Sequence, residues 1–334
     1  MPENYQLTLD EVEALATKTL EQAGASPAAA SSVARSTRLA ERDGIRSHGL
    51  LYVPIYAEHL RCGKVIGSAT PVVTSTSAAA VQVDAGNGFA HTAIDAGWEQ
   101  FTSAAKECGI SAMSLNNSYN CGVLGHHAER IAEDGLVGLC FTHAPASIAP
   151  IGGHKPVVGT NPFALGVPNG KNGAAILIDQ SASVIAKSEI LLRSKTGEAI
   201  EPDWALDENG NPTTDAGEAL KGSMQPSGGY KGFGVGLTVE VLAAALSGAL
   251  LSTQASPFSG TKGGPPSTGQ FFIAINPQSF AGDQFATSIE HLCESIENQD
   301  GARIPGSRRA DNRKRIEVDG VTVDEALMTR IKNA

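Results

Sequence analysis

The chain has 334 residues, enough for one large domain or for two lobes that share a core. Its 25 lysines and arginines against 35 aspartates and glutamates give a net charge of -10, which argues against a nucleic-acid-binding surface and against docking on anionic lipid. The five cysteines are scattered without a Cys-x-x-Cys pair, which argues against a disulfide framework and a structural zinc site and indicates a reducing cytoplasm.

The N-terminal residues lack the basic stretch and apolar run of a signal peptide, so the sequence predicts a cytoplasmic location. The longest apolar region, residues 235–251, is rich in alanine and glycine and is interrupted by Glu240 and Ser247. These interruptions predict a buried helix and not a membrane span. We therefore expect no membrane partner.

Two helices are predicted near the N-terminus. The first begins after Thr8, which opens a capping-box pattern, and ends before Gly24. The second begins with Ser26 as N-cap and Pro27 in the first position, and it runs to about Arg42. Both helices precede the first segment that could carry chemistry.

Strands and helices alternate through the middle of the chain. Strands are predicted over residues 81–84, 110–115, 136–142, 163–167, 174–178 and 270–275, and helices over residues 52–60, 90–108, 123–133, 233–251 and 284–296. Residues 252–268 are rich in serine, glycine and proline, as is typical of a surface loop. Thr322 and Glu325 predict a second capping box before a terminal helix. This order predicts an α/β fold with a mixed sheet and helical segments at both ends.

A dinucleotide-binding Rossmann domain would carry Gly-x-Gly-x-x-Gly between a strand and a helix. Residues 232–236 are rich in glycine but lack the third glycine at the required spacing. The fingerprint is therefore absent, and the sequence argues against a standard Rossmann fold.

Four other segments combine glycine with polar or charged residues. They are Arg-Ser-His-Gly at 46–49, Asn-Asn-Ser-Tyr-Asn-Cys-Gly at 116–122, Gly-Thr-Asn-Pro at 159–162 with the strand ending at 179–181, and Pro-Ser-Gly-Gly-Tyr-Lys-Gly at 226–232. The second segment lies between a predicted strand and a predicted helix. Backbone N–H groups at such a helix N-terminus are suited to binding a pyrophosphate.

In this order the four segments resemble the type-2 malate/L-lactate dehydrogenase family, which includes ureidoglycolate dehydrogenase, sulfolactate dehydrogenase, diketogulonate reductase and the Δ1-piperideine-2-carboxylate reductases. The resemblance extends to Pro-Gly-Ser-Arg-Arg at 305–309 and so spans nearly the whole chain. It implies a single unit over residues 1–334 with the family's own mixed-sheet fold. A cofactor-binding lobe is expected at about residues 75–300, with the helical ends packed on it. The resemblance also implies a homodimer with the active site near the subunit boundary.

Reduction of a 2-oxo acid requires a hydride at carbon and a proton at oxygen. A nicotinamide supplies the hydride, and an imidazole is suited to donating the proton near neutral pH. The resemblance assigns the proton to His48, with Ser47 and Asp179 fixing the tautomer of the ring. It also implies that Tyr52 and Thr160 contact the substrate.

The resemblance further implies a set of contacts to NADP or NAD. These contacts are Ser118, Asn120, Cys121, Gly122, Gln180, Ser181, Lys231, Gly232, Gly306, Ser307 and Arg308. Arg308 and Arg309 suit a 2′-phosphate because guanidinium pairs well with phosphate, which favours NADP over NAD. Within the charged run at 308–315, only Arg308 has a functional case, since such runs are usually solvated faces.

Two positions depart from the family pattern. Tyr52 stands where many members have an arginine that holds the substrate carboxylate, and Asn120 stands where many have a histidine. The second change concentrates the acid–base role on His48. The first leaves the carboxylate without its usual partner, and Arg46 and Lys187 are the candidates to replace it.

The leading hypothesis is hydride transfer between NAD(P)H and a small 2-oxo or 2-hydroxy acid such as malate, lactate or sulfolactate. The alternative within the family is reduction of a cyclic imino acid, Δ1-piperideine-2-carboxylate or Δ1-pyrroline-2-carboxylate, since residues 86–90 are similar to a segment in those reductases. A non-catalytic binding protein on the same fold is the alternative of another class. A hydrolase is disfavoured because the adjacent Ser47 and His48 would rarely pair and no nucleophile elbow is present. No metal is expected, because His126 and His127 are adjacent and point to different sides of a helix.

Overall fold

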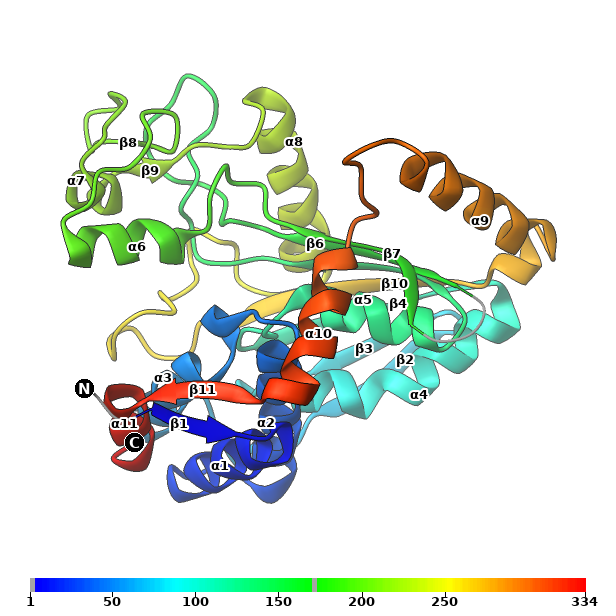
Figure 1. The fold of residues 1–334 in the computed structure, drawn as a ribbon, viewed down its shortest axis with the longest axis horizontal. Helices are drawn as coiled ribbons and strands as arrows, with labels where there is room; N and C mark the ends of the chain where they lie inside the picture. Colours follow the sequence, from blue (N-terminus) through cyan, green and yellow to red (C-terminus); the bar gives the residue numbers. More distant parts are fainter. Residues whose placement is uncertain (1–3, 170–172) are drawn as a thin grey trace.

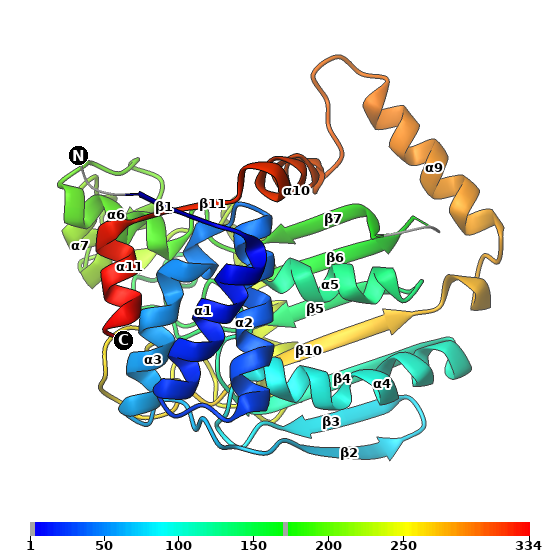
Figure 2. The ribbon, with the colours of Figure 1, turned by 60° about the horizontal axis from the view of Figure 1, so that its bottom comes forward.

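The computed structural model describes residues 4–169 and 173–334, and a seven-stranded mixed sheet forms its centre (Figures 1 and 2). The strands lie in the order β2 (Val72–Ser77), β3 (Ala80–Asp84), β4 (Ile110–Ser118), β10 (Thr268–Ile275), β5 (Val137–Thr142), β6 (Phe163–Pro168) and β7 (Ala174–Gln180). β3 and β4 are parallel, and the other neighbouring pairs are antiparallel. The predicted mixed α/β fold is confirmed. The edge strand β2 was not predicted.

One face of the sheet is covered by α4 (Ala90–Cys108) and α5 (Leu124–Glu133), which Figure 2 shows in front of the strands. Phe101 of α4 and Ile131 of α5 are fully buried against Phe272 of the central strand β10. Burial of each such side chain contributes roughly 1.5–3 kcal/mol. This core holds the carboxyl ends of β4 and β7, where the predicted site residues lie.

The opposite face is covered by the π-helical segment Glu240–Leu246, which packs on β10, β5 and β4 and continues α8 (Tyr230–Val239). The predicted helix over residues 233–251 therefore exists but begins earlier and ends sooner. The prediction that it is buried was wrong for one side, because Leu237 is 46% exposed and Val241 is 53% exposed. An apolar stripe thus faces outward.

The carboxylate of Glu240 links this helix to the Gly-Thr-Asn-Pro turn. It accepts hydrogen bonds from Asn161 Nδ2 at 2.9 Å and from the backbone N–H of Ser252 at 2.7 Å. Asn161 is itself fully buried with a positive φ of 36°. These bonds fix the turn that carries Thr160.

The two ends of the chain meet in a second, two-stranded sheet of β1 (Asn4–Leu7) and β11 (Val321–Asp324). It lies beside α1 (Leu9–Gln22), α2 (Pro27–Arg42), α3 (Val53–Arg61), α10 (Ser307–Asp319) and α11 (Glu325–Lys332) (Figure 1). The capping box at Thr8 is confirmed, because its side chain and that of Glu11 bond reciprocally to the backbone.

The second capping box was wrong. Asp324 is the N-cap of α11 and accepts from the N–H of Leu327, whereas Thr322 lies in β11 and donates to Gln6 Oε1 at 2.9 Å. The local pattern assigned Thr322 to the helix cap, but its hydroxyl instead bonds to Gln6, 316 residues away in the paired strand.

Several elements were not predicted from the sequence. Residues 187–224 form a small lobe of α6 (Lys187–Thr196), α7 (Ala216–Lys221), β8 (Ala205–Leu206) and β9 (Ser223–Met224), and α10 was also missed. α9 (Gln284–Glu297) was predicted, but it has no buried residue and projects from the body of the molecule (Figure 2). Among the described residues, no helix is both long and apolar enough to cross a membrane.

Candidate active site

A cleft of about 440 Å³ gathers residues from five separate parts of the chain. Of the predicted site residues, it is lined by Ser47, His48, Tyr52, Gly122, Thr160, Asp179, Gln180 and Ser181. The turn after α2 supplies the first two, and the end of β7 supplies the last three. Lys187 and Ser188, at the start of α6, and Arg309, on the first turn of α10, complete its polar wall.

His48 ends a short 3-10 turn, Arg46–His48, that follows α2. The hydroxyl of Ser47 lies 3.0 Å from His48 Nδ1, so the pairing that the sequence argued against does form. This contact leaves Nε2 as the ring nitrogen without a hydrogen bond to a described residue. Burial lowers the pKa of His48 from its ordinary 6.5, and the negative charge of Asp179 only partly opposes this effect.

Asp179 stands at the end of β7 with its carboxylate held by two donors. Arg309 Nη2 lies 2.7 Å from Asp179 Oδ2, and the backbone N–H of Gly125, in the first turn of α5, lies 3.0 Å from the same oxygen. No hydrogen bond joins Asp179 to His48 among the described residues, so the aspartate acts on the imidazole through its charge. Arg309, which the sequence assigned to a solvated run, is a cleft residue.

Behind the cleft, Tyr52 belongs to an aromatic cluster. Its ring is parallel to that of His48, with centroids 6.4 Å apart, and it meets Tyr56 edge to face at 4.7 Å. The amide of Asn120 accepts a hydrogen bond from the Tyr56 hydroxyl at 3.0 Å and donates to the hydroxyl of Tyr52. Burial raises the pKa of Tyr52, so its hydroxyl stays neutral. The two positions that depart from the family pattern therefore contact each other.

A buried ion-pair network holds the chain just before Ser47. Arg313 of α10 contacts both oxygens of Asp43 at 2.7 and 2.8 Å and both oxygens of Glu129 at 2.7 Å. The side chain of Asp43, which lies four residues before Ser47, is completely buried. It also forms ion pairs with Arg42 and His126. The network thus joins α2, α5 and α10, and it anchors the turn that presents His48.

The sequence matches a family model described as malate/L-lactate dehydrogenase over residues 7–332. The chain belongs to the malate/L-lactate dehydrogenase family.

Two curated relatives are similar over almost their whole length. The chain is 40% identical to (2R)-3-sulfolactate dehydrogenase (NADP(+)) from Chromohalobacter salexigens, with 96% of each chain covered. It is 37% identical to Delta(1)-pyrroline-2-carboxylate reductase from Ancylobacter novellus, with 99% of this chain and 98% of the relative covered. A delta1-piperideine-2-carboxylate reductase from Pseudomonas syringae pvar. tomato has a similar structure, with a TM-score of 0.92, 32% identity, and 98% and 99% coverage. The chain is an NAD(P)-dependent oxidoreductase.

Of the residues predicted to hold NADP or NAD, Gly122, Gln180 and Ser181 line the cleft, and two other predicted segments are bonded to the chain near the end of β7. The start of α10 is joined to β7 by the hydrogen bond from Leu177 N–H to the carbonyl of Pro305. On the other side, the backbone N–H of Ser227 donates to the carbonyl of Ala182, which brings the loop before Lys231 and Gly232 alongside. The segments before α10 and before α8, which are distant in sequence, are therefore both bonded to the chain near the end of β7.

Two helix N-termini beside the cleft fit a phosphate-bearing cofactor. α6 and α10 have no side-chain hydrogen bond at their N-cap residues, Ala186 and Gly306. Backbone N–H groups of a first helical turn that lack such a cap are available to an anion. Gly306 has a φ of 98° and its missing Cβ would lie 2.9 Å from that of Leu177, so only glycine fits there. Ser307 and the exposed Arg308 follow it directly.

Three of the predicted cofactor residues lie behind the surface of the cleft. Ser118 is buried, and its hydroxyl bonds to the carbonyl of Thr268 and to Gln270 Oε1. Cys121 is buried, and burial raises the pKa of its thiol to about 12. These residues and Asn120 are placed to support the loop that ends in Gly122, whose backbone reaches the cleft.

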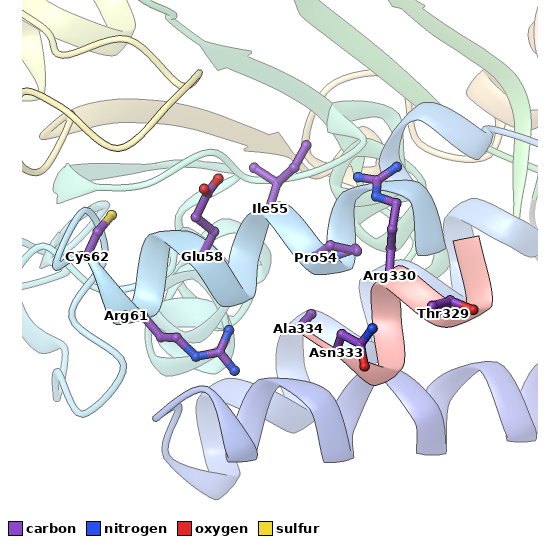
Figure 3. Close-up of a pocket in the computed structure, with 9 residues that line it drawn as sticks. All are labelled: Pro54, Ile55, Glu58, Arg61, Cys62, Thr329, Arg330, Asn333 and Ala334. Atoms are coloured by element: carbon purple, nitrogen blue, oxygen red, sulfur yellow. The ribbon is translucent and has the colours of Figure 1, made fainter. Parts of the chain in front are cut away.

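Another hollow, of about 620 Å³, lies between α3 and α11 (Figure 3). Its polar lining includes Glu58, Arg61 and Arg330, and it shares no lining residue with the cleft at His48. It contains no histidine. No cluster of metal-ligating side chains is found among the residues that the structure describes.

Proposed function

We propose that this oxidoreductase transfers a hydride between NADP(H) and C2 of a small 2-oxo or 2-hydroxy acid, with His48 exchanging the proton on the substrate oxygen. The observation that supports the proposal best is the cleft itself. It combines an imidazole with an available ring nitrogen, a nearby carboxylate and cationic side chains at the end of β7. The names of the relatives, a sulfolactate dehydrogenase and imino acid reductases, agree with a small carboxylate.

When bound, a reduced nicotinamide would supply the hydride that C2 accepts. Nε2 of His48 donates the proton to the developing alkoxide, and Ser47 at Nδ1 keeps the ring in one orientation. The charge of Asp179 stabilises the imidazolium before the proton leaves. In the reverse direction, the neutral His48 removes the hydroxyl proton. Arg308 is exposed at the start of α10, and its guanidinium would favour NADP by pairing with the 2′-phosphate.

A cyclic imino acid is the second candidate substrate, and one observation favours it. Burial lowers the pKa of His48, so the ring is mainly neutral at pH 7. A protonated imine already carries its proton and needs only the hydride, whereas a ketone requires a charged imidazole. Seven of the similar curated proteins are named as pyrroline-2-carboxylate reductases, some also with piperideine-2-carboxylate.

The test is an NADPH and NADH oxidation screen with pyruvate, oxaloacetate, sulfopyruvate, Δ1-pyrroline-2-carboxylate and Δ1-piperideine-2-carboxylate. Turnover of one of these acids is expected. His48→Ala should lower kcat for an oxo acid by roughly 10²–10⁴-fold while NADPH binding, followed by its fluorescence, stays unchanged. Cofactor binding without turnover of any acid would overturn the proposed reaction and favour a binding protein.

We further propose that residues 1–334 form one unit, with residues of about 75–300 as the cofactor-binding lobe, and that the unit works as a cytoplasmic homodimer. The apolar stripe on α8 and its π-helical extension supports the dimer. Leu237, Val241 and Leu246 are 46%, 53% and 60% exposed, and Leu237 and Val241 lie one turn apart on the same helical side. Several exposed large apolar side chains on one helix are a feature that interfaces between subunits share.

A further inference from the structure

The substrate classes proposed above share a negative charge beside the reacting carbon. In a 2-oxo or cyclic 2-imino acid, the carboxylate is bonded directly to the carbon that receives the hydride. A cation must therefore lie in the same cleft as His48 if the substrate is to be held in a reactive orientation.

Three cations lie close enough in the fold to be considered. Arg46 is next to Ser47 in sequence, but it is exposed and does not line the cleft. Arg309 lines the cleft, but its guanidinium is 2.7 Å from Asp179, which balances its charge. Lys187 lines the cleft and has no ion pair or hydrogen bond with any residue that the structure describes. Of the two cations that line the described cleft, Lys187 is the one without a carboxylate partner.

The surroundings of Lys187 favour an anionic partner. Its side chain is open to solvent, as a ligand-binding group must be, yet desolvation by its neighbours lowers the pKa of the ammonium. A charge that has lost part of its hydration gains more from a counterion than a fully hydrated one does. Lys187 is also the first residue of α6, a ten-residue helix without a side-chain cap, and the hydroxyl-bearing Ser188 lines the same cleft. The helix dipole adds to the positive potential there.

We propose that Lys187 binds the carboxylate of the substrate and is the residue that selects small 2-oxo or 2-imino acids. This assignment rests on the proposed function. Tyr52 and Thr160 form other parts of the pocket, but their neutral hydroxyls can only add hydrogen bonds and cannot balance a charge. The carboxylate is thereby directed toward α6, and the C2 substituent is left to His48.

The test compares Lys187→Met and Lys187→Arg with Lys195→Met, a matched control on the last turn of the same helix, exposed and outside the cleft. Lys187→Met should raise KM for the acid at least tenfold, because a charge-assisted hydrogen bond is lost, while KM for NADPH changes less than about twofold. Lys187→Arg should restore most of the affinity, and the control should behave as the wild type. An unchanged KM for the acid, or a loss confined to KM for NADPH, would overturn the assignment.

Calorimetry separates this proposal from the proposed reaction. Oxamate and pyrrole-2-carboxylate are planar carboxylates that cannot accept the hydride, and each is titrated into the protein saturated with NADP⁺. We expect wild-type protein to bind at least one of them and Lys187→Met to bind it at least tenfold more weakly. If both proteins bind equally, or if the wild type binds neither, Lys187 does not hold the carboxylate. If binding depends on Lys187 but no acid is turned over, the assignment stands and the proposed reaction fails.

Discussion

Replacement of Arg313 by methionine tests the role of the buried network in holding the His48 turn. Arg313 makes its four short contacts to two carboxylates, Asp43 and Glu129, whose side chains are 0% and 8% exposed. Methionine keeps much of the side-chain volume and removes the charge. The variant therefore leaves two buried carboxylates with Arg42 as their remaining arginine and His126 as a further partner of Asp43.

Removing one partner of a buried ion pair typically costs about 3–5 kcal/mol. Arg42 remains 2.9 Å from Asp43, and the Arg313 side chain is 23% exposed, so we expect the lower end, about 3 kcal/mol. In a chain of 334 residues about 3 kcal/mol corresponds to a fall in Tm of roughly 4 °C. The turn before Ser47 should also become more mobile. Because this turn positions His48, kcat should fall as well.

Urea unfolding followed by circular dichroism at pH 7 measures the loss, with Arg315→Met as the control on the same helix, where the side chain is exposed. Although burial acts in the opposite direction, hydrogen bonds from Arg313 and His126 hold the pKa of Asp43 well below its usual range. A carboxyl of depressed pKa stabilises the fold above its unfolded pKa of about 3.9 and loses this contribution as pH falls below that value. The difference between wild type and Arg313→Met should therefore shrink below about pH 4. A loss under about 1 kcal/mol at pH 7, or an equal loss in Arg315→Met, would refute the reasoning.

Three further outcomes are expected. Because burial lowers the pKa of His48 below 6.5, oxidation of the hydroxy acid should rise with pH through that pKa and level off by about pH 7.5; a rate still rising above pH 8 would contradict the assignment. Arg308→Ser should raise KM for NADPH at least tenfold and leave KM for NADH unchanged, whereas equal effects on both would exclude a 2′-phosphate contact. If the proposed dimer forms through the apolar stripe, Leu237→Asp, which puts a charge there, should give a monomer in analytical ultracentrifugation where the wild type is a dimer; a wild-type monomer would exclude the interface.

Short-range signals in the sequence predicted most of the central fold. Apolar runs bounded by turn residues predicted β4, β5, β6, β7 and β10. A buried strand carries this pattern within its own few residues, so it can be recognised without knowing its neighbours. The capping box at Thr8 was reliable because both of its hydrogen bonds lie within one helical turn. The absence of a Rossmann fingerprint also matched the observed mixed sheet.

Elements whose stability depends on distant partners were missed. β1 and β11 are four-residue strands, each with only two inward side chains, and they pair across almost the entire chain. α10 has a strongly polar sequence with one buried residue, Ile316, so no apolar periodicity marks it. Its place is set by Arg313 and Arg309, whose partners lie in other elements.

The same reasoning explains which site residues could be found in advance. Ser47 and His48 lie in one short segment, and the family pattern could point to them because the segment is continuous. The ion pair of Arg309 with Asp179 could not be found in this way, since the neighbours of Arg309 in sequence are charged and the run is typical of a solvated face. Only the packing of α10 against β7 turns one arginine of that run toward Asp179. This pair engages the charge of Arg309 within the cleft. The proposal that Lys187 holds the substrate carboxylate depends on that contact, which neither segment's sequence reveals.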